Sequence, residues 1–272
     1  MKTRVVYWII VSILLLTLLV SISVISYKLI SDQIDKNNYN SLVDNKNSLA
    51  GSRPTIPPHP VTPPTGDNGS TDPTGPIEQN ILPEYLPSYQ QNNDLVGWIQ
   101  IPGTSIDYPV VQSRYEKNYY LRRNFQKKDA TCGTIYVREQ CDVNKPSDSV
   151  LLYGHNMRNG TMFHDLINYK EKSFWEQNRY IYFDTLTEYH TYEIVAVFIT
   201  TADPSVGFRY HLFADGNEQT YNKFVSTCKE LALYETGITP TYGQKLLTLS
   251  TCDKEIGYGK DGRLVVVARR VF

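Results

Sequence analysis

The sequence predicts a mainly β domain, a barrel or sandwich with peripheral helices, preceded by one transmembrane helix. The first observation is a set of short runs rich in Val, Ile, Tyr and Thr in the last two thirds of the 272 residues. These residue types favour strands, and Gly, Pro and Asp flank most of the runs. The second observation is an uncharged apolar run near the N-terminus. The third is a proline-rich stretch between that run and the strands.

The apolar run covers residues 5–27, and Lys2 and Arg4 precede it in a tail of residues 1–4. As a helix it extends about 34 Å, which is enough to cross a bilayer. The positive-inside rule places the tail in the cytoplasm and everything after Lys28 outside the cell, as a single-pass protein of the cell membrane. A cleaved signal peptide is the alternative. However, the run is longer than a usual signal core, and no A-x-A cleavage site follows it.

Residues 28–87 are expected to form a polar, Pro-rich extracellular linker. Residues 29–50 are rich in Asn, with helix expected near the membrane, and ten of the fifteen prolines lie between residues 53 and 87. Such a composition cannot build a core, so a spacer is expected. A proline-rich ligand for a partner domain is the alternative. Residues 88–272 are expected to fold as one globular domain without this segment.

The charge of the chain is balanced, with 27 Lys and Arg against 28 Asp and Glu and a formal net charge of −1. This balance argues against a nucleic-acid-binding protein that depends on a dense positive field, so no nucleic-acid partner is expected. The expected helices cover 84–95, 115–124, 161–178 and 217–234, the last with an apolar face at helical spacing. The expected strands cover 97–101, 107–111, 133–137, 149–155, 179–183, 191–200, 245–252 and 263–271.

Three strand ends place chemically active side chains together. Cys252 ends an apolar strand, and Arg263 opens the next one after a glycine-rich loop. If these strands pair antiparallel, the two residues are neighbours, and His155 follows a third strand. A thiol with an imidazole forms a nucleophile and its proton-transfer partner, and an arginine can stabilise an oxyanion. The alternatives are a buried structural cysteine and a different histidine, namely His164, His190 or His211.

Several local sequences in the chain resemble those of the class B sortases. The matching motifs are Thr-Leu-Ser-Thr-Cys at 248–252, Arg-Leu-Val-Val-Val-Ala at 263–268 and Leu-Tyr-Gly-His-Asn at 152–156, with further similarity at 96–98, 106–112, 119–121 and 159–163. The resemblance covers roughly residues 90–272. It implies a sortase-type eight-stranded β-barrel and a cysteine transpeptidase of the hydrolase and acyltransferase type. The long proline-rich spacer departs from the compact class B pattern.

The resemblance also implies roles for individual residues. Cys252 is the nucleophile, His155 the general acid and base, and Arg263 the group that stabilises the transition state. The implied partners are a sorting signal, Asn-Pro-x-Thr-like or related, cleaved after Thr, and a cell-wall precursor amine such as lipid II. Tyr153, Ser250, Thr251 and Asp253 flank these catalytic residues and are expected to line the substrate groove. Asn118 and Leu121 match a region that helps to bind the sorting peptide in the family, and packing or capping is the alternative for these two residues.

The remaining cysteines suggest no cofactor. Cys228 lies on the apolar helix face, and a bridge between Cys132 and Cys141 would require the chain to fold back sharply. No Cys and His cluster has zinc-ligand spacing, so neither metal nor cofactor is expected. Three other functions stay open: a pilus-subunit polymerising sortase, a secreted cysteine peptidase that releases its product to water, and an anchored adhesion domain.

Overall fold

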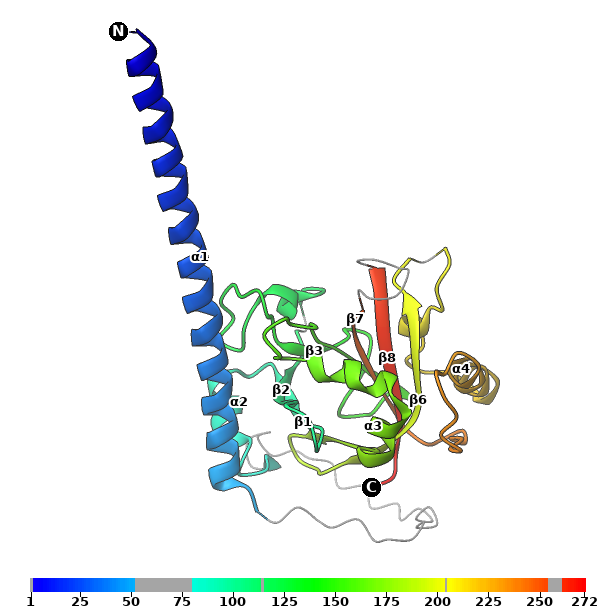
Figure 1. Cartoon of the computed structure of the whole chain (residues 1–272). Coiled ribbons are helices and arrows are strands. Elements are labelled where there is room, and N and C mark those ends of the chain that lie inside the picture. The colour runs from blue at the N-terminus through cyan, green and yellow to red at the C-terminus, as the bar shows by residue number, and fades with distance from the viewer. Residues whose placement is uncertain (1, 52–79, 114, 204, 254–260) are drawn as a thin grey trace.

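A computed structural model describes residues 2–51, 80–113, 115–203, 205–253 and 261–272 of the chain. Within these residues, eight strands form a closed barrel in the order β1-β2-β3-β4-β7-β8-β6-β5. The prediction of an eight-stranded barrel is therefore confirmed. Figure 1 shows the barrel beside one long N-terminal helix. The strands are β1 (Leu95–Gln100), β2 (Asp107–Val111), β3 (Ile135–Val137), β4 (Ser149–Tyr153), β5 (Tyr180–Thr185), β6 (Thr191–Thr201), β7 (Leu246–Cys252) and β8 (Gly262–Arg270).

Two parallel pairings break the antiparallel pattern of the barrel, β2 with β3 and β4 with β7. The longest pairing joins β6 and β8 antiparallel, and β8 also pairs antiparallel with β7. Leu249 in β7 and Val265 and Val266 in β8 have no exposed surface. Strands buried on both faces read as continuous apolar runs, which explains why β7 and β8 are the plainest strands in the sequence.

Short helices cover the outside of the barrel. They are α2 (Leu86–Gln91), η2 (Tyr119–Arg122), η3 (His164–Lys170), α3 (Lys172–Gln177), η4 (Tyr210–Leu212) and α4 (Glu218–Glu230). The structure thus divides the helix expected over 161–178 into η3 and α3. In α4, the side chain of Asn217 caps the first turn by accepting from the Thr220 amide. Its apolar face, which includes Phe224 and Cys228, is buried against the domain.

The helix α1 (Lys2–Leu49) is continuous and forms a stalk (Figure 1). Its N-terminal part is long and apolar enough to cross a membrane, and none of that apolar window is buried in the molecule. Ser12 and Ser21 donate hydrogen bonds to carbonyls of the preceding turn, so these hydroxyls are satisfied within the helix. The helix is therefore compatible with a single-pass membrane anchor.

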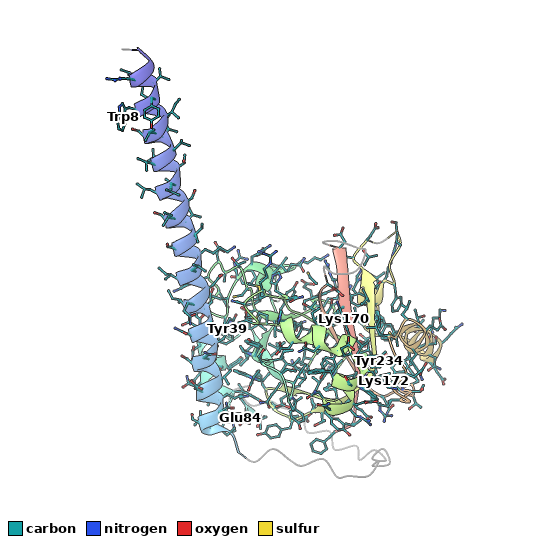
Figure 2. All side chains as sticks on the ribbon, in the orientation of Figure 1. Trp8, Tyr39, Glu84, Lys170, Lys172 and Tyr234 are labelled. Atoms are coloured by element: carbon teal, nitrogen blue, oxygen red, sulfur yellow. The ribbon has the colours of Figure 1, made fainter. Side chains whose placement is uncertain are left out.

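The C-terminal part of α1 packs on the barrel, within the segment expected to be a linker. Asp35, Tyr39, Leu42 and Lys46 are buried and share one helix face. The Tyr39 hydroxyl bonds with the carbonyl of Gly133 and the hydroxyl of Thr134, and Tyr39 lies where α1 runs beside the barrel (Figure 2). This face is largely polar, and hydrogen bonds stabilise its packing on the barrel. The hydrophobic pattern of the sequence therefore did not predict this packing.

Further contacts anchor this part of α1 at its two ends. Lys46 Nζ lies 2.6 Å from Asp107 Oδ1 and 5.1 Å from the centre of the Trp98 ring. Asp35 Oδ1 accepts from Asn124 Nδ2 at 2.7 Å. The helix therefore contacts β2 at Lys46 and the residues that follow η2 at Asp35.

The folded unit also begins before residue 88. Tyr85 is buried, stacks on Trp98 and donates to Asp184 Oδ2 at 2.6 Å. Glu84 is buried as well and bonds with the Tyr189 hydroxyl. A boundary at residue 88 therefore leaves out side chains that pack on the barrel. The prolines at 83 and 87 have the composition of a linker, which is why the sequence placed the boundary too late.

Candidate active site

Cys252 is the last residue of β7, and its register with β8 places it directly opposite Arg263. Both side chains are partly exposed, whereas their neighbours Thr251 and Leu264 are buried. The antiparallel pairing expected from the sequence is thus confirmed. It brings a thiol and a guanidinium to one edge of the barrel, where a substrate can reach them.

His155 reaches the same edge because β4 runs parallel to β7. The register pairs Tyr153 with Ser250, and the bonding continues beyond the strand: the Gly154 amide donates to the Ser250 carbonyl at 3.2 Å. The Thr251 hydroxyl donates to the Gly154 carbonyl at 2.8 Å. These bonds hold the turn that carries His155 against the strand that carries Cys252.

Gly154 is required by close packing. A Cβ at this position would lie 2.6 Å from the Phe163 ring, which is fully buried. The Phe163 amide in turn donates to the carbonyl of His155 at 2.9 Å. Any side chain at 154 would displace this ring and shift His155 with it.

Hydrogen bonds orient the imidazole and the loop around it. His155 Nε2 lies 2.8 Å from the carbonyl oxygen of Leu121. A carbonyl only accepts, so Nε2 carries the proton, and in the neutral ring Nδ1 is the basic nitrogen. Asn156 Nδ2 donates to the carbonyl of Cys252 at 3.1 Å, and Asn156 Oδ1 lies 2.8 Å from His164 Nδ1. His164 therefore lies beside the site and supports Asn156.

Two tyrosines lie close to Cys252 and Arg263, and sequence reasoning missed both. Burial raises the pKa of Tyr136 and Tyr210, negative charge on the nearby Cys252 sulfur raises it further, and the Arg263 cation lowers it. Arg263 Nη1 also donates to its neighbouring carbonyl at Gly262, at 2.8 Å. Tyr136 comes from β3 and Tyr210 from η4, so no local motif links either residue to the site.

Three residues expected to line the substrate groove are buried. Ser250, Thr251 and Asp253 expose 2%, 2% and 1% of their surface. The Ser250 hydroxyl bonds with that of Tyr210 at 2.7 Å, and Asp253 lies 2.9 Å from Lys170 Nζ. The structure thus differs from the expectation, because these side chains meet the interior of the protein and form the framework behind Cys252.

The other expected substrate residues are more accessible. Tyr153 is half-buried and packs on Tyr136. Asn118 is exposed in a left-handed conformation, with φ of 57°, and its side chain accepts from the Tyr136 hydroxyl at 3.0 Å. Leu121 is 38% exposed. Contact of these residues with a peptide stays a prediction.

Among the described residues, two further histidines and three further cysteines occur in the sequence. His190 is buried beside β6, and burial lowers the pKa of His211 on η4. The cysteines at 132, 141, 228 and 252 are all described, and all are free thiols. Only Cys252 among them is accessible.

Comparisons with known proteins place this geometry in a family. The chain matches the Sortase domain family over residues 99–271. It is 33% identical to Sortase B of Listeria monocytogenes over 198 residues, which are 72% of this chain and 77% of that protein. It is 27% identical to Sortase B of Staphylococcus aureus over 195 residues, with the same shares of both chains.

Solved structures share the fold. A Bacillus anthracis protein described as similar to sortase B has a TM-score of 0.70 at 28% identity, covering 88% of this chain and 96% of that one. Sortase B of Clostridium perfringens has a TM-score of 0.61 at 30% identity, over 68% and 98%. A Staphylococcus aureus sortase B–substrate complex has a TM-score of 0.70 at 24% identity, over 89% and 98%.

Proposed function

The chain belongs to the sortase family, in class B, and is a cysteine transpeptidase; we propose that it cleaves a C-terminal sorting signal after Thr and transfers the protein to a cell-wall amine. The observation that carries this proposal is the register that places Cys252 opposite Arg263, with the His155 turn bonded to the same strand. The related Staphylococcus aureus sortase B was solved as a substrate complex, which supports a peptide partner.

In the first half of the reaction, His155 takes the proton of the Cys252 thiol, and the thiolate attacks the carbonyl carbon of the Thr. The tetrahedral intermediate then collapses as the protonated imidazole donates to the leaving amine. The C–N bond breaks, and a thioester joins Cys252 to the Thr. His155 Nδ1 is the basic nitrogen for this transfer, since Nε2 is held by the carbonyl of Leu121.

In the second half, an amine attacks the thioester while His155 takes its proton. Collapse breaks the C–S bond, forms the new amide and returns a proton to the Cys252 sulfur. Arg263 stabilises the negative oxygen in both tetrahedral intermediates, because its guanidinium offers donors at the edge where the thiol lies. The partly exposed edge gives the amine access to the thioester.

The anchor determines where this reaction takes place. We assign residues 1–4 to the cytoplasm, 5–27 to the membrane and the catalytic domain to the outside of the cell, because Lys2 and Arg4 precede the apolar part of α1. The amine acceptor is then a cell-wall precursor such as lipid II. An Asn-Pro-x-Thr-like signal is the substrate that the class B resemblance favours.

The test uses the full chain in detergent with peptides that contain an Asn-Pro-x-Thr core. Intact mass should show an acyl adduct on Cys252 that an added oligoglycine amine resolves to a new amide. Cys252→Ala should form no adduct, whereas Cys228→Ala, which removes a buried thiol of α4, should lose stability but keep the chemistry. Hydrolysis of the adduct at the same rate with and without the amine would indicate a peptidase. The absence of any adduct would refute the proposal.

A further inference from the structure

A basic surface lies beside the active site, between the barrel and α1. We define it as the exposed residues of the segment 115–128, which includes η2. Five basic side chains and one acidic side chain occur in this segment, although the whole chain is balanced in charge. Lys117, Arg122 and Lys128 are exposed, whereas Arg123 and Lys127 also pair within the chain, with Glu116 and Asp94.

Direct contacts connect this basic surface to both α1 and the site. Asn124 donates to Asp35 of α1 at 2.7 Å, and the carbonyl of Leu121 bonds with His155 Nε2 at 2.8 Å. The segment is therefore held between the stalk and the imidazole. If this segment binds another surface, the active site is therefore held in a fixed orientation to that surface.

The stalk brings the basic surface to the membrane. The apolar run ends at Tyr27, eight residues before Asp35, which is about 12 Å along a helix. Figure 1 shows the N-terminal half of α1 and the start of β8 pointing to the same side of the molecule. The end of the barrel that carries Arg263 and Cys252 thus faces the side from which the apolar helix emerges.

We infer that the basic surface at 115–128 binds the anionic headgroups of the membrane in which α1 is anchored, so that the active-site edge faces the lipid surface. This inference rests on the proposed anchor. Each Lys or Arg near an anionic lipid surface adds to the electrostatic attraction between protein and membrane. This attraction decreases over about one Debye length from the surface. Tyr115, which is 97% exposed, adds an amphipathic ring of the kind enriched at membrane interfaces. A lipid-linked amine would then reach the thioester without leaving the membrane.

The test places one nitroxide label at a time on the full chain, in bilayer discs of phosphatidylcholine with or without phosphatidylglycerol. Cys252→Ala removes the accessible native thiol, and the label is attached at Leu16→Cys, Tyr115→Cys or Tyr242→Cys. Tyr242 precedes the start of β7, at the opposite end from Cys252, and is exposed. Accessibility to a water-soluble relaxation agent reports how far each label is shielded by lipid.

The label at 16 should be shielded in both bilayers, the label at 115 only with phosphatidylglycerol, and the label at 242 in neither. Lys117→Gln/Arg122→Gln/Lys128→Gln should weaken the shielded orientation on the order of a hundredfold. The matched variant Lys145→Gln/Lys172→Gln/Lys223→Gln, which removes three exposed lysines elsewhere, should keep it.

Two results would overturn the inference while the anchor stands. One is a label at 115 that is exposed to water in both bilayers while the label at 16 is shielded. The other is equal shielding at 115 with and without phosphatidylglycerol, which contradicts the assigned charge chemistry. A label at 16 that is exposed to water would instead refute the anchor, and this inference with it.

Discussion

The four cysteine thiols differ in burial, and this difference predicts which one reacts. Cys252 is partly exposed, whereas Cys132, Cys141 and Cys228 are buried. Burial raises the pKa of Cys132 to about 12 and also raises the pKa of Cys141 and Cys228. Because the thiolate is the nucleophile, iodoacetamide at mildly alkaline pH should give one adduct per chain, and none in Cys252→Ala. Intact mass measures this, and several adducts formed at the same rate in the folded protein would contradict it.

Arg263 should not tolerate replacement by lysine. An oxyanion requires donors in a fixed planar arrangement, which a flexible ammonium does not reproduce. Arg263→Lys should therefore lower kcat/KM for peptide cleavage in the presence of an amine by a factor on the order of 10². The circular dichroism spectrum should stay unchanged, since the side chain is partly exposed.

Arg269 is the matched control on the same strand. It lies six residues further along β8, roughly 20 Å away, and pairs with Glu193 at 2.8 Å. Arg269→Lys should keep near-normal activity, and so should Arg270→Lys. Full activity in Arg263→Lys combined with loss in Arg269→Lys would place the essential arginine elsewhere.

The ion pair between Lys170 and Asp253 lies next to Cys252 and should contribute to stability. Asp253 follows Cys252 and is 1% exposed, and Lys170 comes from η3 (Figure 2). Lys170→Met removes one ammonium partner of a buried carboxylate, which should cost about 1.5–3 kcal/mol in the free energy of unfolding. Lys172→Met is the control, because Lys172 is exposed two residues away. Thermal unfolding compares the two variants, and an equal melting temperature would show that the pair contributes nothing.

Local motifs predicted part of this site. Cys252 and Arg263 flank one loop, so antiparallel pairing was enough to place them together, and the turn after β4 supplied His155. Tyr136 and Tyr210 reach the site from distant segments through packing, which no local pattern encodes.

At the scale of elements, the hydroxyl of Tyr39 should stabilise the packing of α1 on the barrel. It bonds with the Gly133 carbonyl and the Thr134 hydroxyl, both in a buried environment. Tyr39→Phe removes these bonds and leaves buried polar atoms with fewer partners, at a cost of about 1–2 kcal/mol. Tyr115→Phe, at an exposed position, should have no effect on the melting temperature. A similar melting temperature for both variants would contradict a structural role for the Tyr39 hydroxyl.

The predictability of each element follows from how it is stabilised. All eight strands were predicted because their apolar runs are buried in the barrel, and α4 because Tyr221, Phe224 and Cys228 recur on one face. The packing of α1 was missed because Asp35 and Lys46 are buried as charged residues with partners on the barrel. A hydrophobic pattern cannot reveal a helix face of this kind.

At the scale of the whole molecule, the apolar segment that we propose as the membrane anchor continues in the same helix into the part that packs on the barrel. This helix, α1, runs without a break from Lys2 to Leu49. A spacer that begins directly after the apolar run would leave the barrel free to turn. The continuous helix instead transmits the orientation of the anchor to the barrel, and through Asn124 to the segment beside His155.

Two truncations separate the roles of the two halves of α1. A chain that begins at residue 29 keeps Asp35, Tyr39 and Lys46, so it should be soluble without detergent and keep its peptide cleavage. A chain that begins at residue 51 loses these contacts and leaves Asp107 without the Lys46 cation, so its melting temperature should fall by about 10 °C. Calorimetry and peptide cleavage compare the two chains. Equal stability would show that the folded unit begins after α1 and that the buried helix face contributes nothing to the barrel.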